Sequence, residues 1–300
     1  MASGRNLIVL SDGTGNSASK AFKTNVWRLY QAIDLTDGSQ IAEFADGVGT
    51  SSIKFFRILG LAFGIGVKRN VLTLYKFLCR NYQEGDKIFA FGFSRGAFTI
   101  RVLVGLINYV GLVSYNTEAE LDRNALAAYR AHRKHAFKVR PWLVWVRVLR
   151  FLRDTGVRIW NAIADRKQFS EVKKNPVRIH FVGVWDTVAA YGLPIVELTH
   201  AVNDWVWPLT FAQRNLPLCV DNARHALSLD DERTTFFPTL WDENWEHDFI
   251  NKKQVSHGRL KQVWFVGSHA DVGGGYPDDG LSFVPLSWMI GEAAATCRRF

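Results

Sequence analysis

Residues 87–107 read KIFAFGFSRGAFTIRVLVGLI, and the class of fold follows from this stretch. Residues 87–92 form an apolar run of strand length, and residues 97–107 are apolar enough for a buried helix. The pentapeptide GFSRG between them fits the G-x-S-x-G pattern, a sharp strand-to-helix turn whose serine hydroxyl is exposed and whose glycines let the backbone approach closely. We interpret Ser94 as a nucleophile; the alternative is a plain glycine-flanked turn in which Ser94 caps the helix.

Three further apolar runs of strand length are each followed by polar residues. They cover residues 7–10, 178–185 and 262–266. Nearly continuous apolar runs are typical of strands that are covered on both faces, as in a parallel sheet. We therefore expect a doubly wound, mostly parallel α/β sheet with helices on both faces. In such folds ligands bind beyond the carboxyl ends of the strands, where these polar residues would lie.

A serine hydroxyl is a weak nucleophile near neutral pH, so Ser94 needs a histidine as base and a carboxylate that orients the histidine. In α/β-hydrolases the acid and then the histidine follow the serine along the chain. Asp186 and His269 satisfy this order, and each comes just after a predicted strand. The sequence therefore predicts a triad of Ser94, Asp186 and His269.

Other residues stay open for these roles. Asp271 could serve as the acid, orient a loop or bind a cation, and Asp230 belongs to an acidic group before Arg233 that resembles a structural salt-bridge cluster. His180 lies inside a predicted strand, which favours a structural role. The remaining histidines that we considered have polar or helical surroundings and no predicted strand before them: His225, His247 and His257.

Backbone amides that would hold an oxyanion come from two places. Arg95 would lie at a helix N-terminus, so its amide is the first candidate donor. The loop with Asp12, Gly13 and Thr14 supplies further amides directly after a strand. That loop could instead cradle a phosphate, although it lacks the lysine and spacing of a P-loop, or be a plain glycine turn. Asp12 and Asp271 are candidate supporting residues, and we expect neither a metal nor an organic cofactor.

The net charge of +9 is concentrated in one segment, residues 130–174, which has 13 Lys or Arg and 3 Asp or Glu. Trp142, Trp145 and Trp160 are interleaved with these basic residues, a pattern typical of an anionic membrane surface or nucleic acid. We expect a single domain over residues 1–300, with 130–174 an inserted basic helical cap or lid that contacts anionic membranes. A solvated helical face is the alternative, and we do not expect nucleic acid as a partner.

Composition indicates a globular protein, with 48% apolar and 22% charged residues. The three cysteines are far apart and show no C-x-x-C spacing, which indicates free thiols in a reducing compartment. The first residues do not resemble a Sec signal peptide, and the apolar stretches are too short to span a bilayer. We expect a protein that is cytoplasmic in the producing cell, with any export independent of Sec.

Several motifs in one order resemble the catalytic domain of the type VI secretion phospholipase effectors of the GxSxG class and their uncharacterised α/β-hydrolase relatives. The resemblance covers nearly the whole chain. It implies a Ser-Asp-His triad on Ser94, Asp186 and His269, and for characterised members hydrolysis of phospholipid esters. The matching stretches are residues 11–16, 46–50, 85–101, 182–188 and 263–276.

We therefore expect a serine hydrolase that cleaves carboxylic esters, with lipid or phospholipid acyl esters as substrates. Two other classes of function remain open. One is a binding protein that has the hydrolase fold without its catalysis. The other is a module that binds an anionic ligand, either phosphate or nucleic acid, through the basic segment.

Overall fold

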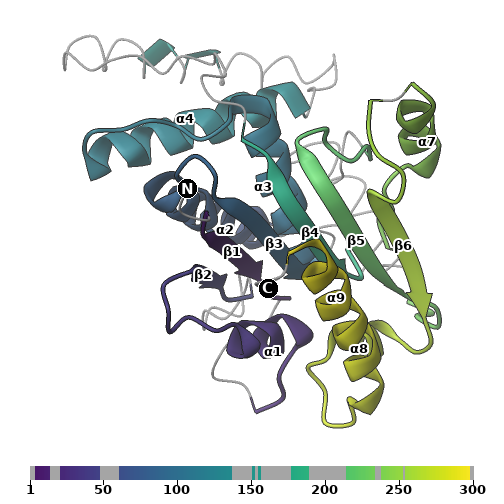
Figure 1. The fold of residues 1–300 in the computed structure, drawn as a ribbon. Helices are drawn as coiled ribbons and strands as arrows, with labels where there is room; N and C mark the ends of the chain where they lie inside the picture. The colour runs from purple at the N-terminus through teal and green to yellow at the C-terminus, as the bar shows by residue number, and fades with distance from the viewer. Residues whose placement is uncertain are drawn as a thin grey trace.

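The computed structural model describes residues 4–13, 21–47, 61–136, 151–152, 155–156, 177–188, 214–233, 238–252 and 254–297. A six-stranded sheet lies at its centre in the order β2-β1-β3-β4-β5-β6, and every neighbouring pair is parallel. The predicted parallel α/β sheet is therefore confirmed (Figure 1). The strands are β1 (Asn6–Ser11), β2 (Gln40–Ala45), β3 (Lys87–Phe93), β4 (Ile179–Trp185), β5 (Val220–Ser228) and β6 (Leu260–Phe265).

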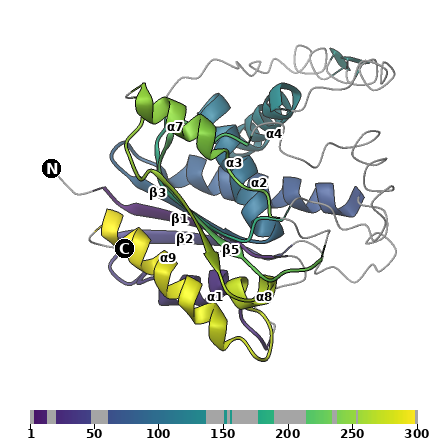
Figure 2. The same ribbon diagram turned by 90° about the vertical axis from the view of Figure 1, so that its right-hand side faces the viewer.

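Helices cover both faces of the sheet, as predicted (Figure 2). In β1, Leu7 and Val9 pack in the core beneath α2, α3 and α4, whereas Ile8 and Leu10 pack in the core formed with α1 and α9. This alternation explains why the strand is apolar at every position. The helices are α1 (Asn25–Ala32), α2 (Leu61–Asn81), α3 (Arg95–Val110), α4 (Glu118–Ala136), α7 (Glu243–Asn251), α8 (His269–Gly273) and α9 (Phe283–Thr296), with a short 3-10 turn η2 (Gly280–Ser282) before α9.

Two strands differ from the sequence-based expectation. The apolar-run criterion missed β2, an edge strand whose middle residues are only half-buried. It also missed β5, because polar side chains occupy its first half. His225 consequently lies inside β5, which corrects the expectation that no strand leads to it.

The predicted cap lies mainly outside the described residues. Residues 130–136 form the carboxyl-terminal part of α4, which packs against α2 and α3. Of the rest of the segment, only residues 151–152 and 155–156 are described. Among the described helices, none combines the length and hydropathy that crossing a bilayer requires.

The turn between β3 and α3 is tightly packed on two sides, and glycines at these positions make the close packing possible. A Cβ atom on Gly92 would lie 2.7 Å from the backbone of Gly96. A Cβ atom on Gly96 would lie 2.0 Å from the carbonyl oxygen of Ser11 at the end of β1. Both distances are shorter than any allowed contact, so only glycine fits at these positions. The turn is thereby held against the neighbouring strand.

We predict that Gly96→Ala destabilises the protein, because the new methyl group collides with the backbone of Ser11. Such overpacking typically costs about 1–3 kcal/mol. Gly291→Ala is the matched control, since a Cβ there meets nothing within 4 Å in helix α9. Urea unfolding should give a lower midpoint for Gly96→Ala, and an equal or higher midpoint for Gly291→Ala. Equal midpoints for Gly96→Ala and wild type would contradict the close packing of the turn.

Candidate active site

Ser94 occupies a strained position between β3 and α3. Its φ of 57° and ψ of −121° lie outside the common regions for a residue with a side chain. Its amide donates a hydrogen bond to the carbonyl oxygen of Trp185, at the end of β4, over 3.0 Å. Strained backbone of this kind persists only where its surroundings hold it, and it is enriched at functional sites. The neighbouring strand therefore fixes the serine.

Asp186 follows β4 directly and is fully buried. Among the described residues, Asp186 and Ser94 are the two non-glycine residues with positive φ. The amide of Asp186 donates to the carbonyl oxygen of Ala226 over 2.7 Å. Its carboxylate accepts hydrogen bonds from the amide and the hydroxyl of Ser228, at 3.2 and 2.9 Å. The buried carboxylate is thus partnered, as a buried charge must be.

His269 begins helix α8, just after β6, and is 8% exposed. Its Nδ1 lies 2.5 Å from Oδ2 of Asp186, and its Nε2 lies 2.8 Å from Oγ of Ser94. The ring also packs on Phe93, with ring centroids 4.6 Å apart. The structure therefore brings together the three residues of the predicted triad, from the ends of β3, β4 and β6.

The hydrogen bonds define what this arrangement can do chemically. With the Nδ1 proton donated to Asp186, the neutral imidazole has a lone pair on Nε2 that accepts the hydroxyl proton of Ser94. The carboxylate holds the ring in that tautomer. A serine in this setting can be deprotonated as it attacks an electrophile.

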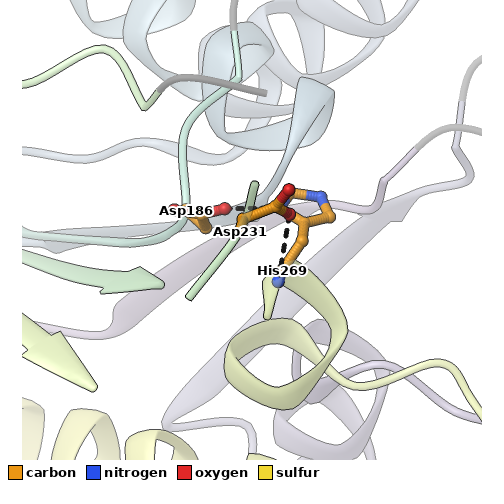
Figure 3. Close-up of side chains that lie close together, drawn as sticks. All are labelled: Asp186, Asp231 and His269. Atoms are coloured by element: carbon orange, nitrogen blue, oxygen red, sulfur yellow. Dashed lines mark hydrogen bonds and ion pairs between the residues drawn. The ribbon is translucent and has the colours of Figure 1, made fainter. Parts of the chain in front are cut away.

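Asp186, Asp231 and His269 also offer possible metal ligand atoms within 4.8 Å of one another (Figure 3). Both ring nitrogens of His269, however, already form the hydrogen bonds to Asp186 and Ser94. Asp231 pairs with the guanidinium group of Arg233 at 2.6 Å. These contacts fit a hydrogen-bonded triad better than a cation site.

Asp271 holds the loop that carries the histidine. Its Oδ2 accepts hydrogen bonds from the amide and the hydroxyl of Ser268, at 2.7 and 2.9 Å. The bond from the Ser268 amide is one half of a capping box at the start of α8, and in the other half the Ser268 hydroxyl accepts the amide of Asp271. Asp271 therefore orients a loop, which was one of the roles considered for it from the sequence. Its hydrogen bonds fix the helical turn on which His269 lies.

The loop after β1 is organised by Asp12, which is 2% exposed. Its carboxylate accepts hydrogen bonds from the amide of Gly13 at 2.6 Å and the hydroxyl of Thr24 at 2.9 Å. The Gly13 amide therefore points at Asp12, although we expected it to face an oxyanion. Thr14 lies outside the described residues.

Arg95 is the first residue of α3. The first amides of a helix lack acceptors within that helix, which suits the Arg95 amide to an anion next to Ser94. Burial lowers the pKa of its guanidinium group to about 10, so the side chain remains protonated at neutral pH.

His225 and Ser228, both on β5, support the acid and were missed from the sequence. Nε2 of His225 accepts a hydrogen bond from the Thr187 amide at 3.2 Å, and its Nδ1 lies 3.2 Å from Oε1 of Gln262. Burial lowers the pKa of His225 to about 3, so its ring is neutral. No motif marks these residues, because their strand lacks the apolar run by which the other strands were found.

Comparison with known proteins bears on both the fold and the family. Residues 5–292 match the family model described as the catalytic domain of the Tle1-like phospholipase effectors of the type VI secretion system. The uncharacterized protein YEL023C of Saccharomyces cerevisiae is 27% identical over 249 residues, which are 78% of this chain and 32% of the yeast protein.

The chain also matches solved structures at low sequence identity. An uncharacterized protein from Pseudomonas aeruginosa has a TM-score of 0.50 and 16% identity, covering 98% of this chain and 46% of that one. The esterase Est2 of Thermogutta terrifontis has a TM-score of 0.44 and 14% identity, covering 100% of this chain and 84% of that one. The chain spans about a third of the yeast protein and less than half of the Pseudomonas protein. The family match shows that this chain belongs to the Tle1-like phospholipase effector catalytic domains of the type VI secretion system.

Proposed function

We propose that this chain is a serine hydrolase that cleaves carboxylic esters, with Ser94 as nucleophile, His269 as general base and Asp186 as the acid that orients the histidine. One observation carries the proposal. It is the continuous buried chain of hydrogen bonds from Ser94 Oγ to His269 Nε2, at 2.8 Å, and from His269 Nδ1 to Asp186 Oδ2, at 2.5 Å. The chemistry needs these groups in this order.

The reaction would proceed in two halves. Ser94 Oγ attacks the ester carbonyl carbon while Nε2 of His269 takes its proton, and Asp186 stabilises the imidazolium that forms. The proton then passes to the departing alkoxide, which leaves an acyl group on Ser94. In the second half water attacks the acyl group, with His269 again as base, and the free acid departs. No step calls for a metal ion or an organic cofactor.

Two backbone regions would hold the oxyanion. The Arg95 amide follows the nucleophile directly, which is the position of one oxyanion donor in α/β-hydrolases. The second donor would come from the loop with Gly13 and Thr14. Because the Gly13 amide bonds to Asp12, it would have to turn toward the substrate, or the Thr14 amide would take this role. Asp12 supports the loop in either case.

Lipid or phospholipid acyl esters are the proposed substrates. The family to which the chain belongs is named for phospholipase effectors, and this name supports a lipid ester over a small soluble one.

We predict that Ser94→Ala lowers ester hydrolysis by about ten-thousandfold or more, because the substitution removes the attacking oxygen. The fold should persist, since only one atom is lost. Rates on p-nitrophenyl esters of increasing acyl length and on phosphatidylglycerol vesicles would measure this loss. Ser282→Ala, another buried hydrogen-bonded serine, is the control and should keep wild-type rates. Wild-type turnover by Ser94→Ala would refute the proposed nucleophile.

For the base and the acid, we expect His269→Ala to be about as damaging as Ser94→Ala, because the two residues act as one unit. Asp186→Asn should leave more residual activity, since Ser94 and His269 remain in place. Asp271→Asn should be the mildest, because Asp271 acts on the loop through Ser268. The same ester assay ranks the variants. If Asp271→Asn lost more activity than Asp186→Asn, Asp271 and not Asp186 would be the acid of the triad.

Residues 130–174 are proposed as a membrane-facing cap, on the sequence pattern alone. Each basic residue near an anionic surface contributes about 1 kcal/mol to binding. We predict that the protein co-sediments more strongly with anionic than with zwitterionic vesicles, and less as salt rises. A variant with Trp142, Trp145 and Trp160 changed to alanine should bind less. Tighter binding to DNA or RNA than to vesicles, in a parallel shift assay, would instead indicate a nucleic-acid surface.

A further inference from the structure

The proposed acid and base come from strands that are not neighbours. Asp186 follows β4 and His269 follows β6, and β5 lies between these two strands in the sheet. Neighbouring strands are about 4.8 Å apart, so the ends of β4 and β6 are roughly 10 Å apart. The carboxylate must therefore reach across the end of β5 to meet the imidazole. The residues at the carboxyl end of β5 therefore lie next to the contact between Asp186 and His269.

The last residue of β5 and the turn that follows it contact the acid, Asp186; they are residues 228–231. We call these four residues the β5 turn. The amide and the hydroxyl of Ser228 donate to the two carboxylate oxygens of Asp186, at 3.2 and 2.9 Å. A carboxylate with one donor on each oxygen cannot rotate freely. Ser228 thereby fixes the plane of the group that receives the Nδ1 proton of His269.

The same turn contacts the loop of the base. The carboxylate of Asp230 accepts a hydrogen bond from the amide of Gly267 at 2.7 Å, and that of Asp231 accepts one from the amide of His269 at 3.3 Å. The Asp230 amide in turn donates to the carbonyl oxygen of Gly267 at 3.1 Å. The β5 turn thus holds residues 267–269 through hydrogen bonds to their backbone. The imidazole of His269 is then available to bond with Ser94 and Asp186.

Asp231 is a second carboxylate close to the imidazole, and its charge is balanced. Its side chain is 5% exposed and pairs with Arg233, whose Nε lies 2.9 Å from Oδ1 and whose terminal nitrogen lies 2.6 Å from Oδ2. The hydrogen bonds from Arg233 hold the pKa of Asp231 below its usual value. A carboxylate that is ionised and paired with a cation is a suitable hydrogen-bond acceptor for a backbone amide.

We propose that the β5 turn positions both halves of the acid–base pair: Ser228 fixes the Asp186 carboxylate, and Asp231, paired with Arg233, fixes the backbone of His269. These are positioning residues, because they act through Asp186 and His269 and do not touch the reacting atoms. The inference rests on the proposed serine-hydrolase function. It goes beyond the triad, because it states that β5, a strand that carries neither the acid nor the base, sets the distance between them.

Ser228→Ala tests the first half, because it removes the hydroxyl donor and keeps the amide donor. We expect kcat to fall about ten- to hundredfold, as for a lost hydrogen bond to a charged group, with little change in KM. The acidic limb of the kcat/KM pH profile should also move to higher pH, since a carboxylate with one donor fewer holds the imidazolium proton more strongly. Ser282→Ala, also buried but with its hydroxyl bonded to the Asp279 carbonyl oxygen and to Arg28, should change neither quantity.

Asp231 offers a matched pair for the second half. Asp231→Ala removes the acceptor of the His269 amide and should lower kcat about tenfold or more, whereas Asp231→Asn keeps an acceptor oxygen and should restore most of the rate. Asp86→Ala breaks a comparable pair with Arg5 and removes the acceptor of the Arg5 amide just before β3, at the edge of the sheet opposite the triad, and should leave kcat unchanged. Urea unfolding of all variants separates a loss of stability from a loss of positioning.

The outcomes distinguish this inference from the proposed function. If wild type hydrolyses no ester, the proposed serine hydrolase fails, and the positioning role fails with it. If wild type is active and Ser94→Ala is not, but folded Ser228→Ala and Asp231→Ala keep wild-type kcat and pH profile, only the positioning role is overturned. The positioning role is supported if, besides Ser94→Ala, only Ser228→Ala and Asp231→Ala lose activity, while Asp231→Asn and both controls stay active.

Discussion

The buried hydrogen bond between His269 Nδ1 and Asp186 Oδ2, at 2.5 Å, is the contact on which the site depends. It joins the ends of β4 and β6 across β5, and it sets the tautomer that lets Nε2 accept the proton of Ser94. A parallel sheet makes this contact possible, because its strands all end at the same edge. The charge of Asp186 can remain buried because Ser228 and His269 both bond to it.

Backbone strain is concentrated at the same edge. Ser94 and Asp186 adopt positive φ angles, and each donates its amide to the carbonyl of a neighbouring strand, Trp185 in one case and Ala226 in the other. These bonds, with the glycines around Ser94, keep unfavourable conformations in place. The stable layers of the fold thus support a local arrangement that the isolated turns would not adopt. The serine and the acid are pre-organised before any substrate binds.

Long apolar runs make four strands and the parallel architecture predictable, and the order of the motifs predicts that Ser94, Asp186 and His269 form one site. The rest was not predictable for physical reasons. Strand β5 carries polar side chains that bond to its neighbours, so it has no apolar signal. The direction of a side chain, such as that of Asp12 toward the Gly13 amide, depends on tertiary contacts that a pattern of residues does not encode.

The central claim is that Ser94 is activated as a nucleophile, and covalent labelling tests it most directly. A fluorophosphonate reacts with an activated serine and stays attached to its oxygen. Peptide mapping by mass spectrometry after labelling should find one adduct for each chain, on the peptide that contains Ser94. Absence of an adduct on the folded protein, or an adduct on another serine with Ser94 unmodified, would contradict the account.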